Sequence, residues 1–411
     1  MKAGWDRVST NGVRVIATML VIVALSGCGM QETTATPSVA SSSTTAPAPT
    51  PELRDDALRQ RGKVVELADA PDAWRAVLPI GTIMQRLVYR SVSGVDGTST
   101  SVSGAFFRPG GTPPPGGWPL IVYAHGTTGI SRDCGPSDQD GMFGDLTAVG
   151  DFLAAGYSVV TTDYQGLGLR PGEQAPHPYL EPRTAAYNVV DAVRAVRSSG
   201  ADVGTRWVAA GRSQGGAAVW STAEQFAGYG DGAGELVGVV AVAPLLDARY
   251  FVTRAQEGTL TRAQQHLYPL IIHGMAQTQD SVTAGDHLSG FAGDAVPTCS
   301  DGRTALAASA VPDDASLNAV TPGAAQTLYD ALGQYALPRV ASNVPILAIY
   351  GADDNVIPVD IMEDTLGRAC DLGDRVLRIR LDQQGHAVDP GPSMASWIRE
   401  RLSGSSSAGN C

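Results

Sequence analysis

The strongest constraint on the fold is a series of short, continuously apolar runs that alternate with helix-like stretches. The runs cover residues 119–124, 157–162, 207–210, 236–243, 345–350 and 376–381. Because they lack the polar alternation of a half-exposed strand, we expect each to be a strand covered on both faces. Residues 146–155 and 183–197 carry Ala, Val and Leu at helical spacing and end near a glycine. This alternation of strands and helices predicts an α/β fold with a mostly parallel central sheet and helices on both faces.

Two regions depart from this alternation of strands and helices. Residues 82–107 contain two runs rich in Val, Tyr, Thr and Phe around a turn at 95–98, which predicts an antiparallel N-terminal hairpin. Residues 247–340 contain Ala-, Gln- and Leu-rich pieces broken by Gly and Pro, which predicts a mainly helical insertion. An insertion that leaves the sheet at its active edge is expected to cap the site, although a surface decoration is the alternative.

Ser213 lies in the sequence Gly-Arg-Ser-Gln-Gly at 211–215, directly after the apolar run 207–210 and before a helix-forming stretch. A sharp turn from strand to helix lifts a serine hydroxyl off the sheet and holds it in place, as a nucleophile requires. The flanking glycines fit such a turn, because a Cβ at either position would collide with the neighbouring strand or helix. We therefore expect Ser213 to be a nucleophile; a plain Gly-Ser loop is the alternative.

A serine nucleophile needs a histidine base, and the base needs an acid that orients it. In one known chain order the serine comes first, the acid second and the histidine last. Of the six histidines, His386 alone both follows Ser213 and stands in a loop directly after a predicted strand. Asp353 and Asp354 follow the run 345–350, and we favour Asp354 as the acid, with Asp353 as a helix or turn cap.

The tetrahedral intermediate of acyl transfer carries a negative oxygen that backbone N–H groups must stabilise. One donor is expected from Gln214, the residue after the nucleophile. The second is expected from the glycine-containing loop 125–129, with Thr127 as the candidate. A simple turn at His125 and Gly126 is the alternative.

The N-terminus is typical of an exported protein. Basic residues precede an apolar stretch, 15–25, that is too short for an ordinary membrane span. The small residues before Cys28 resemble a bacterial lipoprotein box, which implies a signal peptide at 1–27 and lipid on the Cys28 sulfur at the outer face of a bacterial membrane. A plain secretory signal is the alternative. Residues 28–52, rich in Ser, Thr, Pro and Ala, predict a disordered tether before the folded domain, 53–411.

Charge and cysteine content indicate which binding partners, disulfides and metal sites to expect. The net charge is −12 and the chain has no dense run of Lys or Arg, which argues against nucleic acid. Four cysteines remain besides Cys28, and an even number in an exported chain predicts two disulfides, with three pairings open. The four are Cys134, Cys299, Cys370 and Cys411. None has metal-ligand spacing, so we expect neither a metal nor a cofactor.

Several motifs together resemble the secretory lipase family of α/β-hydrolases, which includes the fungal lipase A type and bacterial exported esterases. They are Tyr-Ala-His-Gly-Thr-Thr-Gly at 123–129, Asp-Cys-Gly-Pro-Ser at 133–137, Asp-Tyr-Gln-Gly-Leu-Gly at 163–168, His-Pro-Tyr at 177–179, and the segments 211–216 and 351–358. The resemblance implies a cap, supports Asp354 as the acid, and suggests the pairs Cys134–Cys299 and Cys370–Cys411. The fungal members use a different oxyanion loop, so no side-chain donor carries over to this chain.

Together these features predict a lipase or esterase that hydrolyses carboxylic esters of small molecules or lipids through an acyl-Ser213 intermediate. A serine peptidase or an acyltransferase on the same fold is the alternative, and a non-catalytic binding protein is a further one. With only 6% aromatic residues, the chain favours esterase over interfacial lipase activity.

Overall fold

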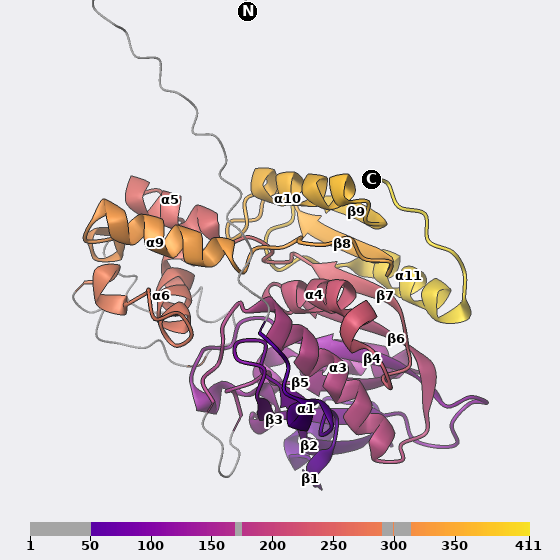
Figure 1. Cartoon of the computed structure of the whole chain (residues 1–411). Coiled ribbons are helices and arrows are strands. Elements are labelled where there is room, and N and C mark those ends of the chain that lie inside the picture. The colour runs from indigo at the N-terminus through magenta and orange to yellow at the C-terminus, as the bar shows by residue number, and fades with distance from the viewer. Residues whose placement is uncertain (1–50, 169–174, 290–298, 300–313) are drawn as a thin grey trace, which may run out of the picture. The chain divides into compact units, whose positions relative to one another are not determined.

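The computed structural model describes residues 51–168, 175–289, 299 and 314–411. Their strands form one nine-stranded sheet in the order β1-β2-β3-β5-β4-β6-β7-β8-β9 (Figure 1). The strands are β1 (Val64–Asp69), β2 (Ile83–Val92), β3 (Ser99–Arg108), β4 (Trp118–Ala124), β5 (Ser158–Thr162), β6 (Val203–Arg212), β7 (Glu235–Val242), β8 (Ile346–Gly351) and β9 (Val376–Leu381).

The direction of the strands changes at β5. From β5 through β4 to β9 every neighbouring pair is parallel, whereas β1, β2, β3 and β5 pair antiparallel. The six apolar runs and the N-terminal hairpin are therefore confirmed as strands. The strand β1 was not predicted from the sequence. It is an edge strand in which Val65 and Leu67 are exposed and the pairing with β2 is irregular between Val64 and Glu66. Its mixed polar and apolar sequence gives no clean two-residue period.

Helices cover both faces of the sheet, as predicted. On β4, Leu120 and Val122 belong to one buried cluster, whereas Ile121 and Tyr123 belong to the other. The first cluster includes side chains of α3 (Pro182–Ser198), α4 (Gln214–Tyr229) and α10 (Val359–Leu372), and the second includes those of α2 (Leu146–Ala154) and α11 (Gly391–Ser403). A sheet buried on both faces needs apolar residues at consecutive positions, which explains the unbroken runs.

The chain between β7 and β8 is helical where the structure describes it. It contains α5 (Arg249–Glu257), α6 (Arg262–Ala276), η5 (Ala284–Asp286), η6 (Asp314–Leu317) and α9 (Pro322–Gly333). In Figure 1 α5, α6 and α9 gather beside the sheet rather than over either face. Residues 290–298 and 300–313 of the predicted insertion lie outside the described residues.

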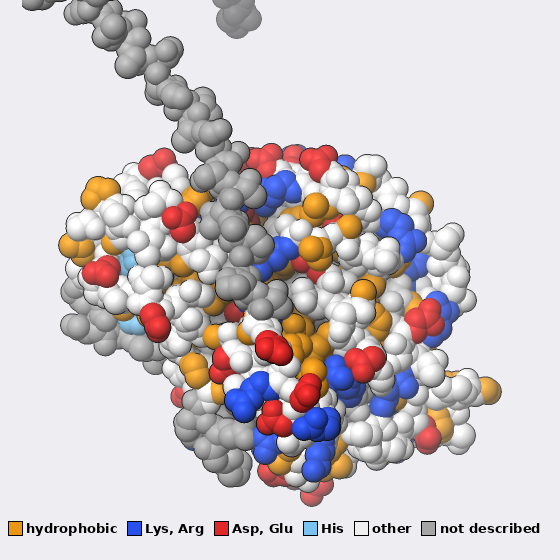
Figure 2. All heavy atoms as spheres, in the orientation of Figure 1, with side chains coloured by type: hydrophobic (Ala, Val, Ile, Leu, Met, Phe, Trp, Pro, Cys, Tyr) orange, Lys and Arg blue, Asp and Glu red, His pale blue; other side chains and the backbone are white. Residues whose placement is uncertain are grey.

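Short elements complete the described part of the chain. They are α1 (Asp55–Leu58) and the 3-10 turns η1 (Asp72–Ala76), η2 (Arg132–Cys134), η3 (Pro136–Asp138) and η4 (Met142–Gly144). The predicted signal peptide, Cys28 and nearly all of the predicted tether lie outside the described residues. Within the described ranges, every helix is too short or too polar to cross a bilayer. Acidic and basic side chains are interspersed over the face shown in Figure 2.

Candidate active site

Ser213 occupies the turn between β6 and α4 in a strained backbone conformation. Its φ of 56° and ψ of −116° are unusual for a residue with a Cβ. The Ser213 N–H donates to the Val242 carbonyl at 2.9 Å, and the Ser213 carbonyl accepts from the Leu245 N–H at 3.1 Å. These bonds to the chain after β7 hold a conformation that the serine would not adopt alone.

The two glycines around Ser213 are needed for space. A Cβ on Gly211 would overlap the Gly215 carbonyl oxygen, and a Cβ on Gly215 would overlap the carbonyl oxygen of Ala124 at the end of β4. Neither glycine has a φ in the left-handed region. The collision expected from the sequence is therefore the reason for these glycines, and the unusual backbone angles belong to Ser213 itself.

The side chains of Ser213, His386 and Asp354 lie in one hydrogen-bonded row. His386 Nδ1 is 2.8 Å from Asp354 Oδ2, and His386 Nε2 is 3.0 Å from Ser213 Oγ. A carboxylate can only accept, so Nδ1 carries the ring hydrogen and Nε2 accepts from the serine hydroxyl. The structure thus brings together three residues that are separated by 173 and 32 positions in the chain.

Asp354, rather than Asp353, faces the histidine. The other oxygen of its carboxylate, Oδ1, accepts from the backbone N–H groups of Val356 at 2.8 Å and Ile357 at 2.9 Å. Its side chain is only 2% exposed, whereas Asp353 is exposed. Three donors fix the orientation of the Asp354 carboxylate, so it can hold the His386 ring in one tautomer.

The helical insertion anchors the loop that carries Asp354. Tyr250 Oη on α5 and Gln264 Nε2 on α6 both donate to the Val356 carbonyl at 2.8 Å. Thr261, which caps the N-terminus of α6, donates from its hydroxyl to the Asn355 carbonyl at 2.6 Å. Burial raises the pKa of the Tyr250 phenol well above its usual value, so the phenol remains a donor. The insertion therefore supports the site directly.

Two backbone segments lie beside Ser213 where an oxyanion would need donors. Gln214 is the first residue of α4, so its N–H has no acceptor within the helix. On the other side, a Cβ placed on Gly126 would lie 3.9 Å from Ser213 Cβ, so the loop after β4 passes close to the nucleophile. Thr127 follows in this loop, and its Oγ1 lies 2.7 Å from Tyr179 Oη.

The motif around Asp163, which follows β5, has a structural rather than a reactive arrangement. The buried Asp163 carboxylate accepts from the Ser137 N–H at 2.9 Å and from the hydroxyls of Ser137 and Ser103. Gly135 and Gly168 pack against each other at this point, because a Cβ on Gly135 would overlap Gly168. The cluster joins η3, β3 and the loop after β5.

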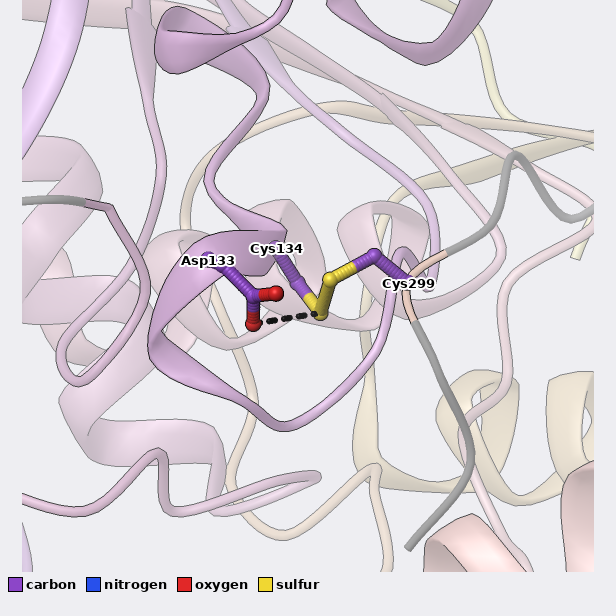
Figure 3. Close-up of side chains that lie close together, drawn as sticks. All are labelled: Asp133, Cys134 and Cys299. Atoms are coloured by element: carbon purple, nitrogen blue, oxygen red, sulfur yellow. Dashed lines mark hydrogen bonds between the residues drawn. A yellow bond between two sulfur atoms is a disulfide. The ribbon is translucent and has the colours of Figure 1, made fainter.

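The structure contains the two disulfides that the family resemblance suggested, Cys134–Cys299 and Cys370–Cys411. Asp133 lies beside the first of them, and its carboxylate oxygen is 3.9 Å from the Cys134 sulfur (Figure 3). In the described part of the chain these three residues are the group whose ligand atoms cluster closely enough to hold a metal. Because the sulfurs are bonded to each other, they cannot act as thiolate ligands.

Part of the chain matches a known protein family. Residues 142–284 match the family model described as secretory lipase. The resemblance to the secretory lipase family is confirmed. A search of curated proteins finds none that matches the chain. The secretory lipase match begins at η4 and ends just after α6, so it contains the turn at Ser213 and the first helices of the insertion.

Solved structures share the fold at low sequence identity. The rice cell wall degrading esterase LipA from Xanthomonas oryzae is 19% identical, with a TM-score of 0.62, over 84% of this chain and 97% of that one. Candida antarctica lipase A is 14% identical, with a TM-score of 0.67, over 87% of this chain and 86% of that one. The fold is that of the α/β-hydrolases, and the secretory lipase match supports a carboxylic ester hydrolase of the lipase and esterase class.

Two residues that contact the site, His177 and Tyr179, carry no catalytic signal in the sequence. His177 contacts the Gln214 side chain and Tyr179 contacts Thr127, and both belong to the His-Pro-Tyr segment quoted only as part of the family motif. The contacts join residues that are 37 and 52 positions apart in the chain. No local period or spacing signals such contacts, and the sequence clue was the mere presence of ring residues in a loop.

Proposed function

We propose that this chain is an exported esterase that cleaves carboxylic esters through an acyl-Ser213 intermediate. The proposal rests on two hydrogen bonds. One joins Ser213 Oγ to His386 Nε2 at 3.0 Å, and the other joins His386 Nδ1 to Asp354 Oδ2 at 2.8 Å. These are hydrogen-bonding distances at which a proton can pass from the hydroxyl to the ring. The secretory lipase match supports the same reaction class.

In the first half of the reaction, Ser213 Oγ attacks the ester carbonyl carbon while its proton moves to His386 Nε2. Asp354 stabilises the resulting imidazolium and keeps its proton on Nδ1. The tetrahedral intermediate then collapses, the bond to the alcohol oxygen breaks, and His386 gives its proton to that alcohol. In the second half, water attacks the acyl group with His386 as base, and the acid leaves as the serine is restored.

The negative oxygen of each tetrahedral intermediate is proposed to accept from the backbone N–H groups of Gln214 and Thr127. Gln214 begins α4, so the helix N-terminus adds a favourable dipole at this oxygen. Loss of one such donor typically costs about 3 kcal/mol in the barrier. The substrate is a small-molecule or lipid ester, and activity along an acyl series from acetate to palmitate would define its acyl length.

The proposal is tested by ester hydrolysis and covalent labelling. Wild-type protein should hydrolyse p-nitrophenyl esters and react with a fluorophosphonate probe, because the probe captures an activated serine. Ser213→Ala should abolish both, whereas Ser393→Ala, at an exposed position on α11, should leave both unchanged. Labelling that persists in Ser213→Ala would refute the assignment. Hydrolysis of aminoacyl anilides but not esters would favour a peptidase, and ester products formed with added glycerol would favour an acyltransferase.

We also propose that the chain is anchored outside the cell by lipid on Cys28, with residues 28–52 as a tether and 247–340 as a cap on the 53–411 domain. The lipoprotein-like residues before Cys28 and the two disulfides support export. Wild-type cells should incorporate labelled palmitate into the protein and retain it in the membrane fraction. Cys28→Ala should lose the label and release the protein, and retention of the label would refute the anchor.

A further inference from the structure

His177 holds the side chain of the residue that follows the nucleophile. Its Nδ1 lies 2.8 Å from the Gln165 carbonyl oxygen, and its Nε2 lies 3.1 Å from Gln214 Nε2. A carbonyl oxygen can only accept, so the ring hydrogen is on Nδ1, and Nε2 accepts from the Gln214 amide. His177 and Gln214 are 3% and 4% exposed, so water does not compete for this contact.

Two positions further on, Tyr179 holds the other side of the site. Its phenol oxygen lies 2.7 Å from Thr127 Oγ1, in the loop that passes Ser213. Burial raises the pKa of Tyr179 to about 12, so the phenol keeps its hydrogen at working pH. Tyr179 is fully buried, and the backbone of α6 packs against it, since a Cβ on Gly274 would lie 2.6 Å from Tyr179 Cβ.

Aromatic rings from neighbouring loops pack around this segment. The ring of His177 packs against those of Tyr164 and Tyr179, with centroid distances of 6.1 and 5.9 Å. Tyr164 in turn packs against His125, at 4.4 Å, and donates from its hydroxyl to the His125 carbonyl at 3.0 Å. The rings therefore connect the loop after β4, the loop after β5 and the N-terminus of α4.

We propose that the segment 177–179 positions both oxyanion donors, with His177 acting through the Gln214 side chain and Tyr179 acting through Thr127. The inference rests on the proposed function, because it assigns these two residues to the same reaction. They are positioning residues and do not touch the reacting atoms. A single buried segment that contacts both donor residues would fix the spacing between the two N–H groups, on which stabilisation of the oxyanion depends.

Two substitutions at His177 separate the contact with Gln214 from the contact with Gln165. An Asn amide can occupy the place of Nδ1 and still donate to the Gln165 carbonyl, but it does not reach Gln214. A Gln amide can reach the place of Nε2 and accept from Gln214, but it loses the bond to Gln165. We expect His177→Asn to lower kcat by about 10- to 100-fold with KM little changed. We expect His177→Gln to recover most of kcat.

Rates are measured with p-nitrophenyl butyrate. A fluorophosphonate probe is allowed to react to completion with each variant, and each rate is divided by the fraction of protein that becomes labelled. This division, together with a thermal melt of each variant, removes any loss caused by unfolded protein. In a Gln214→Met background the contact is already absent, so His177→Asn should cause little further loss of kcat. Tyr179→Phe keeps the ring, removes only the hydroxyl, and should lower kcat about 10-fold with KM little changed, as a second test independent of His177.

Three outcomes would overturn the inference while the proposed function stands. The first is that both His177→Asn and Tyr179→Phe keep the wild-type kcat per labelled serine. The second is that His177→Asn and His177→Gln lower kcat equally. The third is that His177→Asn lowers kcat in the Gln214→Met background as much as it does in the wild type. Failure of the proposed function itself is distinguishable, because the wild type would then show neither ester turnover nor labelling of Ser213.

Discussion

Two buried aspartates follow parallel strands of the same sheet, yet their surroundings differ. Asp163 follows β5 and accepts from two serine hydroxyls and one backbone N–H. Asp354 follows β8 and accepts from two backbone N–H groups and from the ring of His386. Each carboxylate accepts three hydrogen bonds, but only Asp354 has a partner that can become positively charged by taking up a proton, namely the ring of His386.

This difference shows that burial and position at a strand end do not make a carboxylate part of a reactive site. Hydroxyls and backbone amides do not change charge near neutral pH, so the bonds to Asp163 join segments of the fold and do little else. An imidazole does change charge, so a fixed carboxylate beside it can stabilise its cation during proton transfer. Substitution of the two aspartates should therefore give opposite results.

The largest effect is expected for Asp354→Asn. An amide can donate to His386 Nδ1 and so favours the ring tautomer whose Nε2 hydrogen faces Ser213, which blocks proton uptake from the serine. We expect kcat to fall by about 10⁴-fold, with much less change in the melting temperature. Steady-state kinetics and a thermal melt measure the two quantities. Activity within 10-fold of wild type would remove Asp354 from the proposed relay.

A third buried carboxylate, Glu224 on α4, sharpens the comparison because it lacks a comparable set of donors. Its Oε1 accepts from the Arg339 N–H at 3.0 Å, and burial raises its pKa from 4.5 to about 7. Between these pH values the folded chain holds a proton that the unfolded chain has lost, so stability falls as pH rises. Across this pH range we expect the free energy of unfolding of Glu224→Gln to rise relative to that of the wild type, by up to about 3 kcal/mol.

Urea unfolding of wild type and Glu224→Gln at pH 5, 6, 7 and 8 measures this difference in stability. The difference should grow up to pH 7 and then level off. A difference that stays the same at every pH would show that Glu224 does not titrate in the folded chain as its burial implies.

Asp163→Asn should show the opposite of the Asp354 result. The amide cannot accept at every position where the carboxylate did, so we expect a loss of about 2 kcal/mol in the free energy of unfolding. The kcat per labelled serine should stay within a few-fold of wild type. If kcat fell 100-fold while the free energy of unfolding was unchanged, the distinction between the two aspartates would fail.

The smallest effect is expected for Asp353→Asn, next to Asp354 in the same loop. Asp353 is exposed, and its backbone N–H, not its side chain, bonds to the Gln384 carbonyl at 2.9 Å. Both kcat and the free energy of unfolding should stay close to wild type. A large loss of kcat here would point to the alternative that the sequence left open, with Asp353 as the acid.

Much of this account could be predicted from sequence because the signals are local. Apolar runs without polar alternation predicted the parallel strands, and the turn between a strand and a helix located Ser213. Chain order then selected His386 from the six histidines. The strand β1 was missed because a half-exposed, irregular edge strand leaves no two-residue period.

Contacts between distant loops could not be predicted in the same way. Counting cysteines left three pairings open, and only the family resemblance favoured the two pairs that the structure contains. The hydrogen bonds between Gln214 and His177 and between Tyr250 and Val356 join residues 37 and 106 positions apart. Such contacts depend on how loops pack in three dimensions, and residue type alone does not specify them.

The most direct test of the relay is to identify where an acyl group is carried during turnover. Wild-type protein is mixed with p-nitrophenyl acetate, quenched in acid during the first turnover, and digested for peptide mass spectrometry. If Ser213 carries the acyl group, an acetyl group should appear on the peptide that contains Ser213, formed together with the first p-nitrophenol released. His386→Ala should show no such adduct over the same interval. Release of p-nitrophenol without acetylated Ser213, or with the acetyl group on another residue, would contradict the acyl-Ser213 intermediate.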